Sequence, residues 1–170
     1  MKSRSDLDRL VAYNLDVLDQ ALAVITAHES APGADFSRHC GPHLRHVIEH
    51  YQAFLDHVHE RSIDYDDRPR DAQAQRCTAT ARARLLDIRQ RLAALRVEAL
   101  PDRLAIHLRG GCAGDDNFVT FSSVGRELMF VASHAVHHYA IIQLHCRRHG
   151  IELGADFGKA PSTLRHERRR

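Results

Sequence analysis

Apolar residues recur at every third or fourth position over four long stretches of this chain, a period that is typical of amphipathic α-helices. The four predicted helices cover about residues 6–28, 42–61, 71–100 and 122–149. Between the third and fourth helices, apolar and polar residues alternate around a glycine-rich turn, which predicts a small β-hairpin over about residues 104–121. Residues 151–170 contain proline and glycine, and we expect them to form an extended tail.

Residues at the ends of these stretches support the same division. Pro42 suits the first turn of the second helix, and Pro101 follows the end of the third. Ser122 or Ser123 can cap the fourth helix, which is expected to stop at Gly150. This order of elements favours an all-α fold, a four-helix bundle with the β-hairpin inserted between its third and fourth helices. The 170 residues are predicted to form a single domain.

Composition narrows the class of protein. The chain is 44% hydrophobic and 27% charged, which is typical of a soluble globular protein, and its net charge of +2 argues against a nucleic-acid partner. No apolar run approaches the roughly 20 residues of a membrane span, and the first ten residues lack a signal-peptide core. We therefore expect a cytoplasmic protein without a membrane partner. The four cysteines lie far apart, which predicts reduced thiols used in packing.

Histidine is the exception to this ordinary composition. The chain has 14 histidines, and most of them fall in two windows, residues 39–59 and 134–149. The segment SHAVHHYAII, residues 133–142, places three histidines in an otherwise apolar helical pattern. A buried imidazole is costly unless its nitrogens find partners, so these side chains either bind something or bond one another.

Two histidine stripes have the spacing of metal ligands. His134 and His138 lie one helical turn apart, so both rings project from one face of the fourth helix. On the second helix His43, His46 and His50 share one side, and any one of them could complete a three-histidine site inside a bundle. Such a site leaves positions for water or substrate, which is typical of catalytic metal centres.

Residues near the two histidine stripes indicate which kind of metal site is expected. The chain contains no Glu-x-x-His sequence, which argues against a di-iron carboxylate bundle. Glu127 lies two turns before His134 and is a better candidate than Glu49 for supporting a ligand or adding a fourth one. His137 points about 100° away from His138, so we expect it to support the site or an interface. A metal-free core of hydrogen-bonded histidines stays an open alternative.

The segments GPHLRHVIEHY and SHAVHHYAII, with the helix lengths between them, resemble the DinB/YfiT-like superfamily of metalloenzymes. The IDYDDRPRD connector, the SSVGRELMFVASH segment and the DFGKAPSTLR tail resemble a bacterial subgroup of DinB-family proteins. This resemblance covers most of the chain, and it rests on the order and spacing of the motifs.

The resemblance implies a four-helix bundle, often a homodimer, that holds zinc or nickel with one histidine of the second helix and the HxxxH pair of the fourth. Carried over by position, the ligands are His46, His134 and His138. The family's usual spacing from Gly41 selects His46, and His50 is the next candidate. Characterised relatives include transferases and isomerases that use low-molecular-weight thiols.

Two functional hypotheses follow. The first is a metal-dependent enzyme that activates water or a low-molecular-weight thiol for transfer to, or hydrolysis of, a small-molecule substrate. In this hypothesis Glu127, His50 and His137 are candidates to orient a ligand or carry a proton. The second is a non-catalytic, stress-related bundle that binds a metal or a small ligand. A fourth ligand from Glu127 or His50 would close the metal site and favour the second hypothesis.

Overall fold

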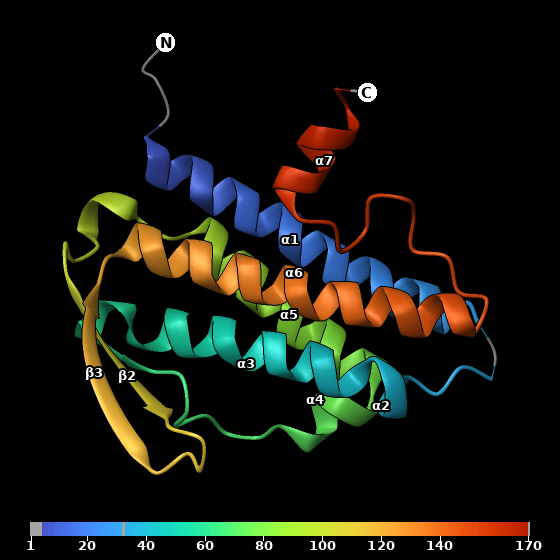
Figure 1. Ribbon diagram of the computed structural model, residues 1–170, viewed down its shortest axis with the longest axis horizontal. Coiled ribbons are helices and arrows are strands. Elements are labelled where there is room, and N and C mark those ends of the chain that lie inside the picture. The colour runs from blue at the N-terminus through green and yellow to red at the C-terminus, as the bar shows by residue number, and fades with distance from the viewer. Residues whose placement is uncertain (1–4, 32, 170) are drawn as a thin grey trace.

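Four long helices form the body of the protein (Figure 1). The computed structural model describes residues 5–31 and 33–169. The long helices in this part of the chain are α1 (Asp6–Glu29), α3 (Gly41–His57), α5 (Thr78–Ala93) and α6 (Val124–Arg148). Both α1 and α3 contact α5 and α6, so the four helices enclose a common apolar core.

Shorter elements connect and extend these helices. They are the helices α2 (Phe36–His39), α4 (Ala72–Arg76) and α7 (Pro161–Glu167), the 3-10 turns Val58–Glu60 and Val97–Ala99, and the strands β1 (Ser62–Asp64), β2 (Leu104–Gly110) and β3 (Asp116–Ser122). The prediction of a mainly helical fold with a β-hairpin is confirmed. The predicted number of four helices is not, because the described residues form seven α-helices.

The predicted hairpin is part of a three-stranded sheet. Strands β2 and β3 pair antiparallel, with Leu104 opposite Ser122, as the alternating pattern predicts. Strand β1 belongs to the connector that follows α3. It pairs in parallel with the edge of β2 that does not pair with β3, so β2 is the central strand. Its central residue, Ile63, is fully buried, so β1 anchors the connector against the core near the end of α3.

The single helix predicted over residues 71–100 is wrong, because the chain divides there into α4 and α5. Cys77 separates the two helices with an extended backbone, φ −124° and ψ 117°. The Asp71 side chain caps α4 by accepting hydrogen bonds from two backbone N–H groups, while its own N–H donates to Glu49 of α3. This tertiary contact fixes α4 beside α3. Hydrophobic periodicity along the sequence does not predict such a contact.

The tail predicted as extended over residues 151–170 is also wrong in part. Residues Pro161–Glu167 form α7, which begins with the proline at a position where a missing N–H costs nothing. The backbone N–H of Gly158 donates to the side chain of Gln20 at 3.1 Å, so the segment before α7 is fixed to α1. Arg170, the last residue of the predicted tail, lies outside the described residues.

Helix α1 starts with a capping box in which Ser5 and Asp8 each accept a hydrogen bond from the other's backbone N–H. Among the described helices, α1 alone is long and apolar enough to cross a membrane, judged by length and composition only. Its apolar residues Val17, Leu18 and Ile25 are fully buried. These three residues belong to the core that α1 shares with α5 and α6.

A polar link inside the core joins three of the long helices. Asn14 of α1 is fully buried, and its amide donates to the carbonyl oxygens of Leu10 and, across the core, Leu128 of α6. The hydroxyl of Tyr51, on α3, donates to the side-chain oxygen of Asn14 at 2.7 Å. A buried polar group without a partner costs about 1–3 kcal/mol, so this link favours one relative position of α1, α3 and α6.

Replacing Gly41 by alanine is expected to lower the free energy of unfolding by about 1–3 kcal/mol through overpacking. A Cβ atom there would lie 1.9 Å from the carbonyl oxygen of Gln75, so α4 would have to move away from α3. Gly125→Ala is the matched control, because its Cβ would meet only Leu7 and Leu10, at 3.4 and 3.6 Å, and alanine favours a helix by about 1 kcal/mol. Urea denaturation measures both, and an unchanged midpoint for Gly41→Ala would contradict this packing.

Candidate metal centre

The two predicted histidine stripes face each other where α3 packs against α6. Helix α3 begins with Pro42 in its first turn, and α6 begins where Ser123 accepts a hydrogen bond from the N–H of Arg126. Apolar side chains on either side of the stripes are buried in the core, so the hydrophobic contact between the helices also fixes the facing histidines.

The structure brings His46, His134 and His138 together. One ring nitrogen from each of the three lies within 4.8 Å of the other two. The Nε2 atoms of His134 and His138 are 2.9 Å apart, and the ring of His46 lies 4.9 and 4.8 Å from theirs, centroid to centroid. All three side chains are partly buried, so one side of the cluster is open to solvent or to a ligand.

The chemistry of this cluster fits a divalent transition-metal ion. Burial is the largest cause that lowers the pKa of His46 to about 4 and of His138 to about 3, and it also lowers the pKa of His134. The three rings are therefore neutral near pH 7, the form in which imidazole binds metals. The buried Nδ1 of His134 has no hydrogen-bond partner among the described residues. Three neutral imidazoles suit zinc, nickel or copper better than magnesium or calcium.

His43 contacts the cluster from the solvent side without joining it. Its Nδ1 lies 3.0 Å from Nδ1 of His138, so one ring donates a hydrogen bond to the other. This bond occupies the nitrogen of His138 that faces away from His134 and orients the ring. The structure thus gives His43 a positioning role rather than that of the third histidine.

His50 has partners for both ring nitrogens. Its Nδ1–H donates to the carbonyl oxygen of His46 at 2.8 Å, and the Arg68 guanidinium donates to its Nε2 at 2.8 Å. Burial lowers the pKa of His50 to about 2, which keeps the ring neutral. Its ring lies 4.1 Å from that of His134 and stacks on Tyr65. The ring of His50 therefore borders the cluster, and the positively charged guanidinium of Arg68 is hydrogen-bonded to this ring.

Glu127 and His137 lie outside the cluster. Glu127 is buried, and its carboxylate accepts hydrogen bonds from the hydroxyls of Tyr65 and Ser122 rather than from a histidine. His137 is exposed, and its ring lies 5.5 Å from that of His138. Neither residue is placed to bind an ion held by the cluster.

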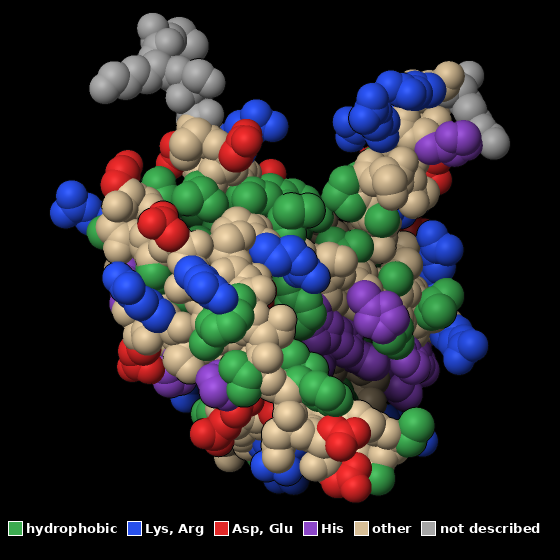
Figure 2. Space-filling view, turned by 60° about the vertical axis from the view of Figure 1, so that its left-hand side comes forward, with side chains coloured by type: hydrophobic (Ala, Val, Ile, Leu, Met, Phe, Trp, Pro, Cys, Tyr) green, Lys and Arg blue, Asp and Glu red, His purple; other side chains and the backbone are tan. Residues whose placement is uncertain are grey.

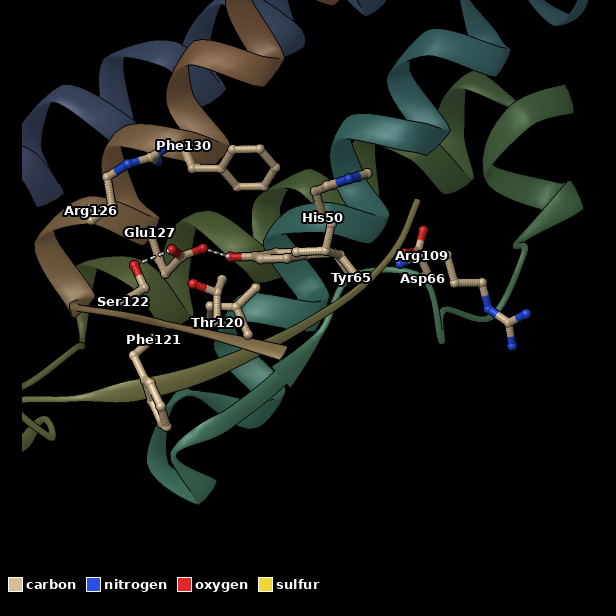
Figure 3. A pocket seen from close by; sticks show the side chains of 12 residues that line it. His50, Tyr65, Asp66, Arg109, Thr120, Phe121, Ser122, Arg126, Glu127 and Phe130 are labelled. Carbon is tan, nitrogen blue, oxygen red and sulfur yellow. Dashed lines mark hydrogen bonds between the residues drawn. The ribbon is translucent and has the colours of Figure 1, made fainter. Parts of the chain in front are cut away.

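A cavity of about 500 Å³ adjoins the cluster (Figure 3). His50 and Phe130 line it, and both rings also contact the ring of His134. Figure 3 shows the hydroxyls of Tyr65 and Ser122 directed at Glu127, and the rings of His50 and Phe130 lie next to that of Tyr65. The remaining lining residues are Asp66, Ile106, Leu108, Arg109, Thr120, Phe121 and Arg126.

Arg68 is a residue of this site for which the sequence offers two roles. In the connector IDYDDRPRD, it is a candidate to bind an anionic substrate, and a local salt bridge with an aspartate is the simpler expectation. The structure instead places Arg68 half-buried against His50, and within residues 5–31 and 33–169 it makes no ion pair. Burial lowers its pKa, although an arginine stays charged near pH 7.

Further histidines continue the cluster toward the surface. The ring of His39 lies 5.4 Å from that of His145 and 4.7 Å from that of His149, and His145 in turn lies 6.1 Å from His43. Figure 2 shows histidine side chains gathered in a band on one face of the molecule. His149, at the end of this series, is exposed.

Comparisons with known proteins are consistent with this arrangement. A sequence model of the DinB superfamily matches residues 16–142, which include all three clustered histidines. FK506-binding protein 5 of Rhizopus delemar is 32% identical over 104 residues, which cover 61% of this chain and 27% of that protein. The match thus spans about a quarter of that relative's length. No solved structure matches the chain.

The metal-free protein is expected to lose stability as the pH falls from about 6.5 to about 4. An unfolded histidine takes up a proton near pH 6.5, whereas the folded pKa is about 4 for His46 and about 3 for His138. The unfolded state therefore binds more protons in this window, and the free energy of unfolding decreases. Urea midpoints measured against pH in the presence of a chelator test this expectation.

Two variants test whether the clustered histidines cause this loss of stability at low pH. His46→Asn should flatten the decline of the urea midpoint, because it removes one group that is buried in neutral form. His137→Asn should leave the decline unchanged, because this side chain is exposed. Equal slopes for the parent and both variants would show that the clustered rings are not the cause.

Proposed function

This chain belongs to the DinB superfamily, and we propose that it is a divalent-metal-dependent enzyme in which His46, His134 and His138 bind Zn²⁺ or Ni²⁺. The convergence of three neutral ring nitrogens from two facing helices is the observation that supports this proposal. An ion held there would lower the pKa of a bound water or thiol and so supply a nucleophile near neutral pH. The proposed reaction is transfer of a small thiol to an electrophile, or hydrolysis of a small substrate.

An open metal site favours the enzyme over a non-catalytic metal-binding bundle. A closed site needs a fourth protein ligand, and the sequence offers His50 and Glu127 for that role. Both hold other partners, since His50 bonds Arg68 and Glu127 bonds Tyr65. With these two engaged, the three histidines leave positions for water or substrate.

The cavity beside the cluster is the proposed substrate site. Its volume of about 500 Å³ suits a small molecule. Phe130 and Ile106 offer an apolar wall, whereas Tyr65 and Glu127 offer a hydrogen-bonded polar one. A substrate bound there would have its reactive end beside His134, because the cavity meets the cluster at the rings of His50 and Phe130.

Arg68 gives the proposed site a preference for anions. Its guanidinium donates to His50 and makes no ion pair within the described chain, although the charges of Glu49 and Asp66 act on it, so an anionic group that binds beside His50 would meet a positive charge. Arg126 adds a second cation at the rim of the cavity. A negatively charged thiol or ester would therefore bind with its anionic group toward Arg68.

The proposal extends to the state of the protein in the cell. We expect this mainly helical fold to form one domain and to pair as a homodimer in the cytoplasm. Its partner in the reaction is a small molecule, with no nucleic acid or membrane involved. The small net charge of +2 supports the exclusion of nucleic acid.

The untagged protein, purified without a chelator, is expected to lose about one equivalent of bound zinc or nickel when His134 and His138 are both replaced by alanine. The double substitution removes two of three ligands, so the third cannot retain the ion. Elemental analysis measures the metal, and circular dichroism establishes that the variant stays folded. His137→Ala is the matched control and should keep its metal, because this exposed residue lies outside the cluster. A folded double variant with the parent's metal content would refute the centre.

Arg68→Met is expected to raise KM for an anionic substrate by about tenfold to a hundredfold, the worth of a lost hydrogen bond to a charged group. The substrate would come from a screen of thiol transfer and ester hydrolysis, each compound paired with an uncharged analogue. Metal content should stay unchanged, since Arg68 bonds His50 and not the three histidines. Arg70→Met is the control, because Arg70 is an exposed neighbour in the same connector. An equal effect on charged and uncharged compounds would contradict this role of Arg68.

A further inference from the structure

A second group of metal-ligating side chains lies where the ends of α1, α3 and α6 meet. His28 is in the last turn of α1, Cys40 directly precedes α3, and Cys146 is in the last turn of α6. The three residues come from parts of the chain that are separated by up to 118 positions. None of them belongs to the three-histidine centre or to the cavity beside it.

The distances within this group are those of a metal site. The Sγ atoms of Cys40 and Cys146 are 3.8 Å apart, and Nε2 of His28 lies 3.8 Å from Sγ of Cys146 and 3.0 Å from Sγ of Cys40. Tetrahedral zinc, with Zn–S of about 2.3 Å and Zn–N of about 2.0 Å, separates its ligands by about 3.8 Å (S to S) and about 3.5 Å (S to N). The separation of the two sulfurs matches this geometry, and that of His28 from Cys146 is slightly longer than it requires. The third is a hydrogen-bond length, which would lengthen once an ion replaced the shared proton.

Burial and charge favour a divalent ion among these donors. Cys40 is fully buried, Cys146 is 1% exposed and His28 is 8% exposed. Two thiolates, one neutral imidazole and one divalent cation form an assembly without net charge, which is the state that a buried site favours.

Packing alone leaves one feature of this group unexplained. Buried cysteines are common in apolar cores, and burial of Cys40 and Cys146 agrees with the packing role expected from the sequence. The imidazole of His28, however, is nine-tenths buried, and its Nδ1 has no hydrogen-bond partner among the described residues. The Nε2 atom of this ring lies beside both sulfurs, so a cation bound between the three donors would give the buried imidazole a stronger partner than the two thiols alone.

We propose that His28, Cys40 and Cys146 form a second metal site, for a thiophilic divalent cation such as Zn²⁺. Binding forms two metal–sulfur bonds and one metal–nitrogen bond, and the protons of the two thiols pass to solvent. The ion links the ends of α1, α3 and α6 and so stabilises the folded protein. The burial of its three donors favours a structural role over a catalytic one, and a fourth ligand from outside this group would complete the coordination.

Cobalt provides a direct test, because Co²⁺ bound to thiolate gives a near-ultraviolet charge-transfer band that histidine ligands do not give. The full chain, kept reduced and freed of metal, is titrated with Co²⁺ and followed by absorption. We expect one equivalent to produce the thiolate band and Zn²⁺ to abolish it. Cys40→Ser and Cys146→Ser should each weaken Co²⁺ binding at least tenfold or abolish the band. Cys112→Ser, at an exposed cysteine, is the matched control and should keep it.

The same titration separates this site from the three-histidine centre. The band should persist in the His134→Ala/His138→Ala variant, so loss of one site leaves the other measurable. Absence of a thiolate band in the folded parent protein would overturn the second site whether or not the variants fold. A band that persists when Cys40 and Cys146 are both replaced by serine would overturn it as well. His28→Gln gives a further check, with an expected loss of affinity of at least tenfold and both sulfurs retained.

Discussion

The packing of α3 against α6 is the constraint on which the candidate metal centre depends. His46 and the pair His134 and His138 come from helices that are far apart in the chain, so their nitrogens converge only in one register of the two helices. Both helices contribute buried apolar residues to the common core, Ile48 from α3 and Ala135 from α6 among them. Hydrophobic burial thus provides the free energy that holds three partly desolvated imidazoles together. The lowered pKa values of His46 and His138 reflect what that burial costs their charged forms.

The link between Asn14 and Tyr51 restricts that register further. Apolar contacts are not directional, so they tolerate small shifts of one helix along another. The Asn14 amide must reach the carbonyl oxygen of Leu128, and the Tyr51 hydroxyl must reach Asn14, at 3.1 and 2.7 Å. A shift of α3 or α6 by one turn would leave these fully buried groups unpaired. The polar link therefore fixes the relative positions of the facing histidines more precisely than apolar packing alone would.

Much of the architecture can be predicted from local patterns, and the failures have a common cause. Helical periodicity locates α1, α3 and α6, and the spacing of His134 and His138 selects a metal-binding face, because these signals lie within one helix. The break at Cys77 depends instead on the contact of Asp71 with Glu49, across 22 positions. Arg68 beside His50 and the group around Cys40 likewise form only when distant segments meet. No pattern in a single sequence records such contacts.

The two proposed metal sites lie at different positions along α3 and α6, one near the helix ends and one near the middle. Thiolates bind zinc-like ions more tightly than imidazoles do, and a buried site exchanges its ion slowly, so the group of His28, Cys40 and Cys146 suits a permanent ion. The three-histidine centre is partly exposed beside a cavity, so its ion can meet a substrate. Both sites bridge the same two helices, and Cys40 lies only six positions before His46. An ion at the helix ends would therefore hold α3 and α6 in the register that the histidine centre requires.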